Sequence, residues 1–334
     1  MFLSKFPGAR LEIKNVLISI KIFSLLFIAL LLLGCEPVQN SENAPTLYAS
    51  LPERESLIPE DAQKMSPGND KLPPQLHSDK FKQPIPLPFP VNTRGLEDSA
   101  FVLPDGQTLY VWFTPNNHMD TLEQSQDKVT GIYQFTKKGE SWSQSERVWL
   151  EDPGQPHLDG CGFFSKDSLY FCAARTDYQG LRWLKAHKDD GNWGEPELVD
   201  FPLEYAVGEL HITRDGTTVY FHSDRPGGKG GLDIWVMHRE NGRWTPPVNV
   251  EVLNSERDEG WPALNPQETE LWITRDYGIW QSVKVDGKWQ SPELIVSTLA
   301  AEASIDQDGN VYFTHHYFIQ DQMIEADIYV INRR

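Results

Sequence analysis

One stretch of the chain decides its fold: Tyr220-Phe221-His222-Ser223-Asp224-Arg225-Pro226-Gly227-Gly228-Lys229-Gly230-Gly231-Leu232-Asp233-Ile234-Trp235. Both ends are rich in β-branched, aliphatic and aromatic residues, as β-strands are, and the proline and glycines between them form a turn or loop. A strand–loop–strand unit cannot bury its apolar face alone. Further copies of the unit are therefore expected along the chain.

The copies are present. An apolar–aromatic pair recurs at Leu109-Tyr110, Leu169-Tyr170, Val219-Tyr220, Leu271-Trp272 and Val311-Tyr312. A glycine shortly before a tryptophan recurs at Trp142, Trp193, Trp244 and Trp289, spaced 51, 51 and 45 residues apart. Four strands fit in each unit, and four-stranded repeats of about 40–50 residues are typical of β-propeller blades. The pattern predicts an all-β protein, a five-bladed β-propeller of four-stranded antiparallel blades over residues 80–334.

The last unit stops at Arg334, after its third strand. Residues 81–87 repeat the aromatic–Pro–apolar pattern that forms the outermost, edge strand of the other units, where proline is tolerated. We expect residues 80–92 to supply the missing strand and close the ring. The alternative is that this segment only prolongs the tether that precedes it.

The N-terminal residues have the pattern of a targeting signal. Lysines and an arginine precede an apolar run over residues 22–33, which is too short to cross a membrane as a helix but suits a signal peptide. The run ends in Leu32-Leu33-Gly34-Cys35, which resembles the bacterial lipobox. The resemblance implies that 1–34 is cleaved as a lipoprotein signal peptide, that Cys35 is lipidated, and that Glu36 permits sorting to the outer membrane, on its periplasmic side or surface. Residues 35–79, rich in proline, are expected to be a disordered tether.

The opening stretch is similar to the WD-repeat-like β-propeller family of the periplasmic TolB type. The third unit carries the whole Ser-Asp-Arg-Pro-Gly-Gly loop and Asp-Ile-Trp strand, and the other units carry parts of both. The resemblance implies an envelope protein that binds protein or glycan partners as a non-enzymatic binding or assembly scaffold. The fold by itself implies no reaction, because propellers host both binders and enzymes.

The net charge of the chain limits the kinds of partner that it can bind. The net charge of −18 disfavours nucleic acid, which needs a basic face. The glycine-rich loop 227–231 lacks the pattern that cradles phosphates, so no nucleotide is expected. No cofactor is expected either, although an acidic face could hold Ca²⁺.

An acidic residue lies near the start of the innermost strand of every unit, and the facing loops carry arginines. We expect both sets to form a ligand-binding face: Asp98, Asp159, Glu209, Glu259 and Glu302, with Arg175, Arg225 and Arg275. One interpretation is structural, with each acid paired to a loop arginine in a binding scaffold.

Two other interpretations remain open. The order of acids resembles that of five-bladed arabinanase- or xylosidase-type glycoside hydrolases, which implies Asp98 as general base, Asp159 as orienting acid and Glu209 as general acid. A third possibility is a lectin-like propeller, in which Trp261 or Tyr277 would stack on a sugar ring.

Two cysteines flank a predicted hairpin. If Lys166-Asp167 is its turn, Cys161 and Cys172 lie directly opposite each other. They could form a disulfide or remain two free thiols. The first unit also has an inserted loop, 116–130, which is expected to overhang the acidic face.

Overall fold

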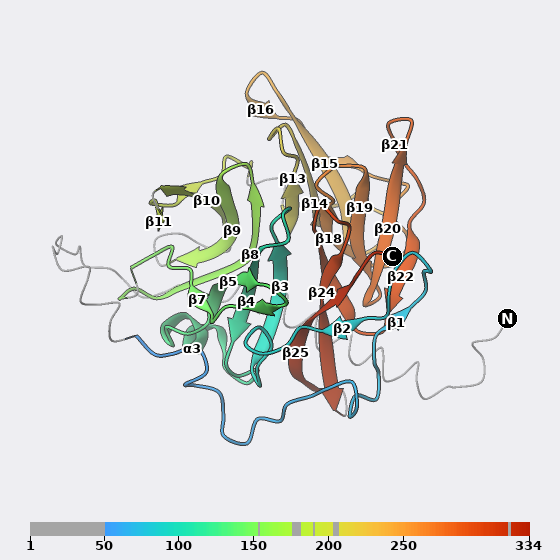
Figure 1. Ribbon diagram of the computed structural model, residues 1–334. Coiled ribbons are helices and arrows are strands. Elements are labelled where there is room, and N and C mark those ends of the chain that lie inside the picture. The colour runs from blue at the N-terminus through green and yellow to red at the C-terminus, as the bar shows by residue number, and fades with distance from the viewer. Residues whose placement is uncertain (1–50, 153, 176–181, 190, 203–206, 320–321) are drawn as a thin grey trace.

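The computed structural model describes residues 51–334, except 153, 176–181, 190, 203–206 and 320–321. Over these residues the protein is all-β, and its only helix is the short α3 (Thr121–Gln126). Within the same part of the chain, no helix is long and apolar enough to cross a membrane. Figure 1 shows the strands as successive antiparallel groups that follow one another in chain order.

Five groups of strands correspond to the five sequence units. The first contains β3 (Leu96–Val102), β4 (Thr108–Thr114), β5 (Gly131–Lys138), β6 (Ser141–Trp142) and β7 (Glu146–Arg147). The second contains β8 (His157–Ser165), β9 (Ser168–Arg175), β10 (Arg182–Asp189), β11 (Asn192–Trp193) and β12 (Glu197–Leu198). The third contains β13 (Leu210–Ile212), β14 (Thr218–Ser223), β15 (Asp233–Glu240), β16 (Arg243–Trp244) and β17 (Val248–Asn249). The fourth contains β18 (Glu259–Leu264), β19 (Glu270–Arg275), β20 (Gly278–Val285), β21 (Lys288–Trp289) and β22 (Glu293–Ser297). The fifth contains β23 (Ala300–Ile305), β24 (Val311–Ile319) and β25 (Gln322–Ile331).

The fifth group gains its outer strand from the N-terminal side of the chain. The short strand β2 (Ile85–Pro86) pairs antiparallel with β25, with Ile85 opposite Val330. One parallel contact, Ala326 with Leu96, then joins β25 to β3. Strands from the two ends of the chain therefore share one nine-stranded sheet.

The recurrent apolar–aromatic pair lies at the start of the second strand of each group. Its first members are fully buried between neighbouring sheets, at Leu109, Leu169, Val219, Leu271 and Val311. This burial explains why an aliphatic residue recurs there, since each fully buried aliphatic side chain contributes about 1.5–3 kcal/mol to folding.

Residues 51–79 differ from the expected disordered tether. Arg54, Ile58 and Met65 are buried against the body, and β1 (Gln75–Leu76) pairs with β22 at the edge of the fourth group. The proline content of this segment suggested extension, but its few apolar and basic side chains are enough to dock it. Residues 35–50 of the expected tether, and the signal peptide 1–34, lie outside the described residues.

Candidate functional site: a central carboxylate pocket

A β-bulge interrupts the first strand of four groups at the same register. The bulged residue has a left-handed backbone in each case, with φ of 47° at Ser99, 53° at Cys161, 51° at Trp261 and 60° at Glu302. Glu209 holds the corresponding position in the third group, two residues before the register pair His211–Tyr220. Bulges redirect side chains, and here they produce one equivalent position per group.

These five equivalent residues line a single pocket of about 60 Å³. Each belongs to the start of a different group, so the first strands of all five groups meet around this space. The residues that follow the bulges, such as Phe101 and Phe163, form its apolar part. We call this space the central pocket.

Three carboxylates interact at the central pocket: Asp98, Glu209 and Glu302. Burial, together with the neighbouring charge of Asp98, raises the pKa of Glu209 to about 7 and that of Glu302 well above its usual range. The Ser99 hydroxyl donates a hydrogen bond of 2.5 Å to Glu302 Oε2. Among the described residues, no lysine, arginine or histidine forms an ion pair with any of the three. The pocket therefore brings together three carboxyl groups without a basic ion-pair partner among the described residues, and burial favours the protonated form of Glu209 and Glu302.

Neutral and aromatic groups surround these acids. The His222 ring lies within 3.4 Å of the backbone nitrogens of both Glu209 and Trp261, and burial lowers its pKa to about 4, so it is uncharged at neutral pH. The Trp261 indole N–H is directed toward Glu209 but outside standard hydrogen-bond geometry. Burial and the charges of Asp98 and Glu302 raise the pKa of Tyr277, which keeps its phenol protonated.

The other two predicted acids are ion-paired away from the pocket. Asp159 is fully buried and forms an ion pair of 2.6 Å with the partly buried Arg175, and Glu259 forms an ion pair of 2.6 Å with Arg275 in the same way. The expectation of one ring of five equivalent acids is therefore wrong. Asp159 and Glu259 stand two residues before the bulge, and their counterpart in the first group is Glu97, not Asp98.

Arg225 also has a packing role. Its guanidinium lies over the rings of Phe221 and Trp235, 5.7 and 5.2 Å from their centroids. Of the predicted cations, Arg175 and Arg275 neutralise acids and Arg225 stacks on aromatic rings. None of the three lines the central pocket.

The cysteines are free thiols rather than a disulfide. The predicted turn at Lys166-Asp167 is present, because Ser165 pairs with Ser168. The bulge at residues 161–162 shifts the register beyond it, so Cys172 lies opposite Gly160. Cys161 becomes instead a lining residue of the central pocket.

Sequence reasoning missed Ser99, Glu97 and His222. One signal could have identified the bulges: a glycine precedes the pocket residue at Gly160, Gly208 and Gly260. At Gly208 an added Cβ would lie 2.4 Å from the His222 ring, so only glycine fits there. A repeated glycine inside a strand is a mark of a bulge or a close approach.

No metal centre is evident in the described part of the chain, where no group of three or more His, Cys, Asp or Glu side chains could hold an ion.

Comparison with known proteins shows that this chain is similar to some of them in fold. No family model matches the chain, and no curated protein matches it. Among solved structures, a thermostable family-43 glycoside hydrolase is 16% identical, with a TM-score of 0.48 over 74% of this chain and 92% of its own. An α-L-arabinofuranosidase from Lactobacillus brevis is 13% identical, with a TM-score of 0.46 over 74% and 92%. TolB from Acinetobacter baumannii is 13% identical, with a TM-score of 0.38 over 73% and 56%. At these scores the likeness carries no argument about function.

Proposed function

We propose that this chain is a lipid-anchored envelope protein whose five-bladed propeller binds a small cationic group in the central pocket. The observation that carries the proposal is the meeting of Asp98, Glu209 and Glu302 from three different groups of strands without an ion-pair partner among the described residues. Holding carboxylates close together out of water is costly. Acids with only a packing role would not need to be held in this costly arrangement. Asp159 and Glu259, which have a packing role, are each neutralised by an arginine.

A five-bladed ring is supported by the central pocket itself. Its lining takes one equivalent position from each of five groups of strands, and β2 adds a fourth strand to the last group. An ammonium or guanidinium group suits the small volume of about 60 Å³. The Trp261 ring, which lines the pocket, adds a face that attracts cations. The cation could belong to a free amine or to a basic side chain of a partner protein.

Binding is tested by titrating the protein with n-propylammonium and following amide chemical shifts, with n-propanol as the neutral analogue. We expect saturable shifts at the pocket with the ammonium only. Glu209→Gln and Glu302→Gln should each weaken binding about tenfold or more, since a charge-assisted contact is lost. Glu140→Gln, an exposed acid far along the chain from the pocket, is the matched control. Equal binding of propanol, or unchanged binding by both pocket variants, would contradict the proposal.

The lipid anchor is tested separately. Wild-type chain should fractionate with membranes and carry a diacylglyceryl modification on Cys35, detected by mass spectrometry of the N-terminal peptide. Cys35→Ser should release the chain into the periplasmic fraction. A wild-type chain that remains unmodified would remove the anchor from the proposal without affecting the pocket.

A glycoside hydrolase is the second candidate, and one observation favours it. Glu209, whose pKa is raised to about 7, lies beside Asp98, and such a pair can divide the roles of general acid and general base. Asp159, the third acid of that pattern, is held by Arg175 instead of facing the pocket. The test is hydrolysis of arabinose- and xylose-based oligosaccharides. Hydrolysis by the wild type that is lost in both Glu209→Gln and Asp98→Asn would support the glycoside hydrolase. The absence of hydrolysis by the wild type would exclude these substrates.

A further inference from the structure

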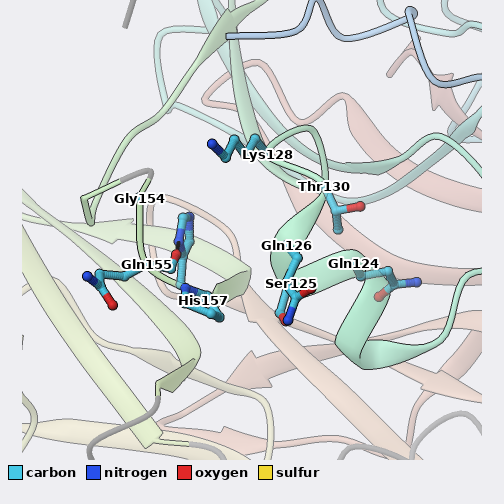
Figure 2. A pocket seen from close by; sticks show the side chains of 9 residues that line it. Gln124, Ser125, Gln126, Lys128, Thr130, Gly154, Gln155 and His157 are labelled. Carbon is cyan, nitrogen blue, oxygen red and sulfur yellow. Dashed lines mark hydrogen bonds between the residues drawn. The ribbon is translucent and has the colours of Figure 1, made fainter. Parts of the chain in front are cut away.

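A second cavity, larger than the central pocket, lies where the inserted loop of the first group meets the start of β8. Its volume is about 250 Å³. The end of α3, the residues directly after it and the loop 154–157 line the cavity (Figure 2). Neither the fold resemblance nor the central pocket accounts for this space, which we call the amide cavity.

The side chains that line the amide cavity are neutral or basic, in contrast to the acidic composition of the whole chain, although Asp127 next to the cavity accepts a hydrogen bond from the lining Thr130. The protein has 48 acidic residues against 30 basic ones, yet none of the nine lining residues is acidic. Lys128 is the one lining residue with a full charge at neutral pH, because burial lowers the pKa of His157. A cavity whose one charged lining side chain is a lysine favours an anion over a cation.

Several lining groups are free to bind a ligand. In the part of the chain that the structure describes, the side chains of Gln126, Lys128 and Gln155 make no hydrogen bond or ion pair. Figure 2 shows Gln126 and Lys128 beside the open space, whereas the Gln155 side chain extends away from it. Gln and Lys side chains together offer amide N–H and ammonium donors. A carboxylate could accept from these donors in the same way that it accepts from protein groups.

His157 adds a different group. Its Nδ1 lies 2.8 Å from the carbonyl oxygen of Gln155, and a carbonyl can only accept, so Nδ1 carries the proton. In a neutral ring the other nitrogen, Nε2, is then an acceptor. Trp149 packs edge-on against the ring at 6.1 Å between centroids and helps to fix its orientation. An acceptor next to several donors suits a ligand that bears hydroxyl groups as well as a carboxylate.

We infer that the amide cavity is a binding site for a hydroxylated carboxylate, with Lys128 holding the carboxylate and His157 Nε2 accepting from a hydroxyl. The site is independent of the central pocket. Cys161 and His157 lie four residues apart on β8, roughly 13 Å along the strand. The two sites are thus neighbours that bind groups of opposite charge.

The experiment is a calorimetric titration of the complete mature protein with sodium D-glucuronate at constant ionic strength. D-Glucose, which lacks the carboxylate, and sodium acetate, which lacks the hydroxyls, are the comparison ligands. We expect glucuronate to bind saturably, at least tenfold more tightly than either. Binding of glucose equal to that of glucuronate, or no saturable glucuronate binding, would overturn the inference.

Variants locate the site. Lys128→Gln should weaken glucuronate binding about tenfold or more, while Lys138→Gln, the same change at an exposed lysine of β5, should leave it unchanged. Gln126→Ala, a change near the surface that does not disturb the core, should weaken it severalfold. Glu209→Gln should leave glucuronate binding unchanged. A failure of the inference about the amide cavity can therefore be distinguished from a failure of the proposal for the central pocket. Unchanged binding by both Lys128→Gln and Gln126→Ala would overturn the assignment to this cavity.

Discussion

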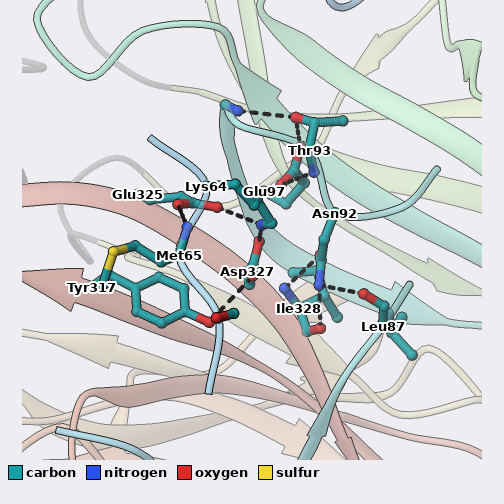
Figure 3. A network of polar contacts seen from close by, with 12 residues as sticks. Lys64, Met65, Leu87, Asn92, Thr93, Glu97, Tyr317, Glu325, Asp327 and Ile328 are labelled. Carbon is teal, nitrogen blue, oxygen red and sulfur yellow. Dashed lines mark hydrogen bonds and ion pairs between the residues drawn. The ribbon is translucent and has the colours of Figure 1, made fainter. Parts of the chain in front are cut away.

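Arg54 and Glu97 form a buried ion pair, with 2.6 Å between Nη2 and Oε1 and side chains only 3% and 0% exposed. The same guanidinium donates to the carbonyl oxygens of Pro90 and Val91 and lies over the Phe113 ring at 4.4 Å. The N-terminal segment thus provides, in the first group of strands, the cation that Arg175 and Arg275 provide in the second and fourth. Figure 3 shows a second such contact, in which Lys64 pairs with Glu325 and Asp327. Residues 51–79 are therefore a part of the folded body.

Replacing Arg54 should destabilise the protein strongly. In Arg54→Ala the Glu97 carboxylate stays buried without its partner, and breaking a buried pair in this way costs about 3–5 kcal/mol. The measurement is urea unfolding followed by tryptophan fluorescence. The control is Arg257→Ala, whose pair with Asp276 is 3.6 Å long and exposed, and which should cost less than about 1 kcal/mol. Equal effects of the two changes would mean that the segment does not dock.

The strands could be predicted from the sequence because their signals are local. Alternating residues, the apolar–aromatic pair and the turn residues each report on a single hairpin, and all recur. The equivalence of the acids could not be predicted in the same way. The bulge lies at the same place in both strands, but the turn that follows is longer in the first group, where Val102 pairs with Leu109, than in the second, where Ser165 pairs with Ser168. Asp98 and Asp159, which look alike in the sequence, therefore stand at different register positions.

Contacts across the chain escaped prediction for a related reason. Arg54 and Glu97 are 43 residues apart, and Lys64 and Glu325 are 261 apart. Nothing in the composition of residues 51–79 marks which of their few basic and apolar residues will dock. The offset of Cys161 from Cys172 follows from the same bulge that places Cys161 in the central pocket.

The docking of the segment before β2 depends on Phe81. Its side chain is fully buried, packs edge-on against Trp272 at 6.0 Å, and its backbone bridges to Arg333. We expect Phe81→Ala to lower the free energy of unfolding by about 3–5 kcal/mol, since it empties a core site. Leu198→Ala removes a side chain that is 61% exposed and should change stability by less than about 0.5 kcal/mol. A small effect of Phe81→Ala would show that the N-terminal segment contributes little to the fold.

The pKa of Glu209 predicts how stability varies with pH. Its folded value of about 7 lies above its ordinary value of 4.5, so the folded state binds the proton more tightly than the unfolded state. Stability from this group is complete below pH 4.5 and falls as pH rises toward about 7. Glu209→Gln should therefore reduce the loss of stability between pH 4.5 and 8 by about 1–3 kcal/mol.

The check is a series of urea unfolding curves at pH 4.5, 5.5, 6.5, 7.5 and 8 for wild type, Glu209→Gln and the exposed control Glu140→Gln. The control should follow the wild-type profile. Wild type and Glu209→Gln with parallel profiles would mean that Glu209 is ionised and solvated in the folded protein.

The Cys161 thiol should react slowly in the folded protein. The adjacent Cys172 thiol, burial and the charges of Glu209 and Glu302 all raise its pKa well above the usual range, and only the thiolate is alkylated. We expect iodoacetamide to modify Cys161 at least tenfold more slowly at pH 8 than an unfolded control, and Cys172, which is buried, more slowly still. Because Glu209 contributes to the shift, Glu209→Gln should accelerate labelling of Cys161 severalfold, whereas Glu140→Gln should not. Labelling at the rate of an exposed cysteine would contradict the pocket geometry. A mass for the intact chain that increases on reduction would show a disulfide in place of the two thiols.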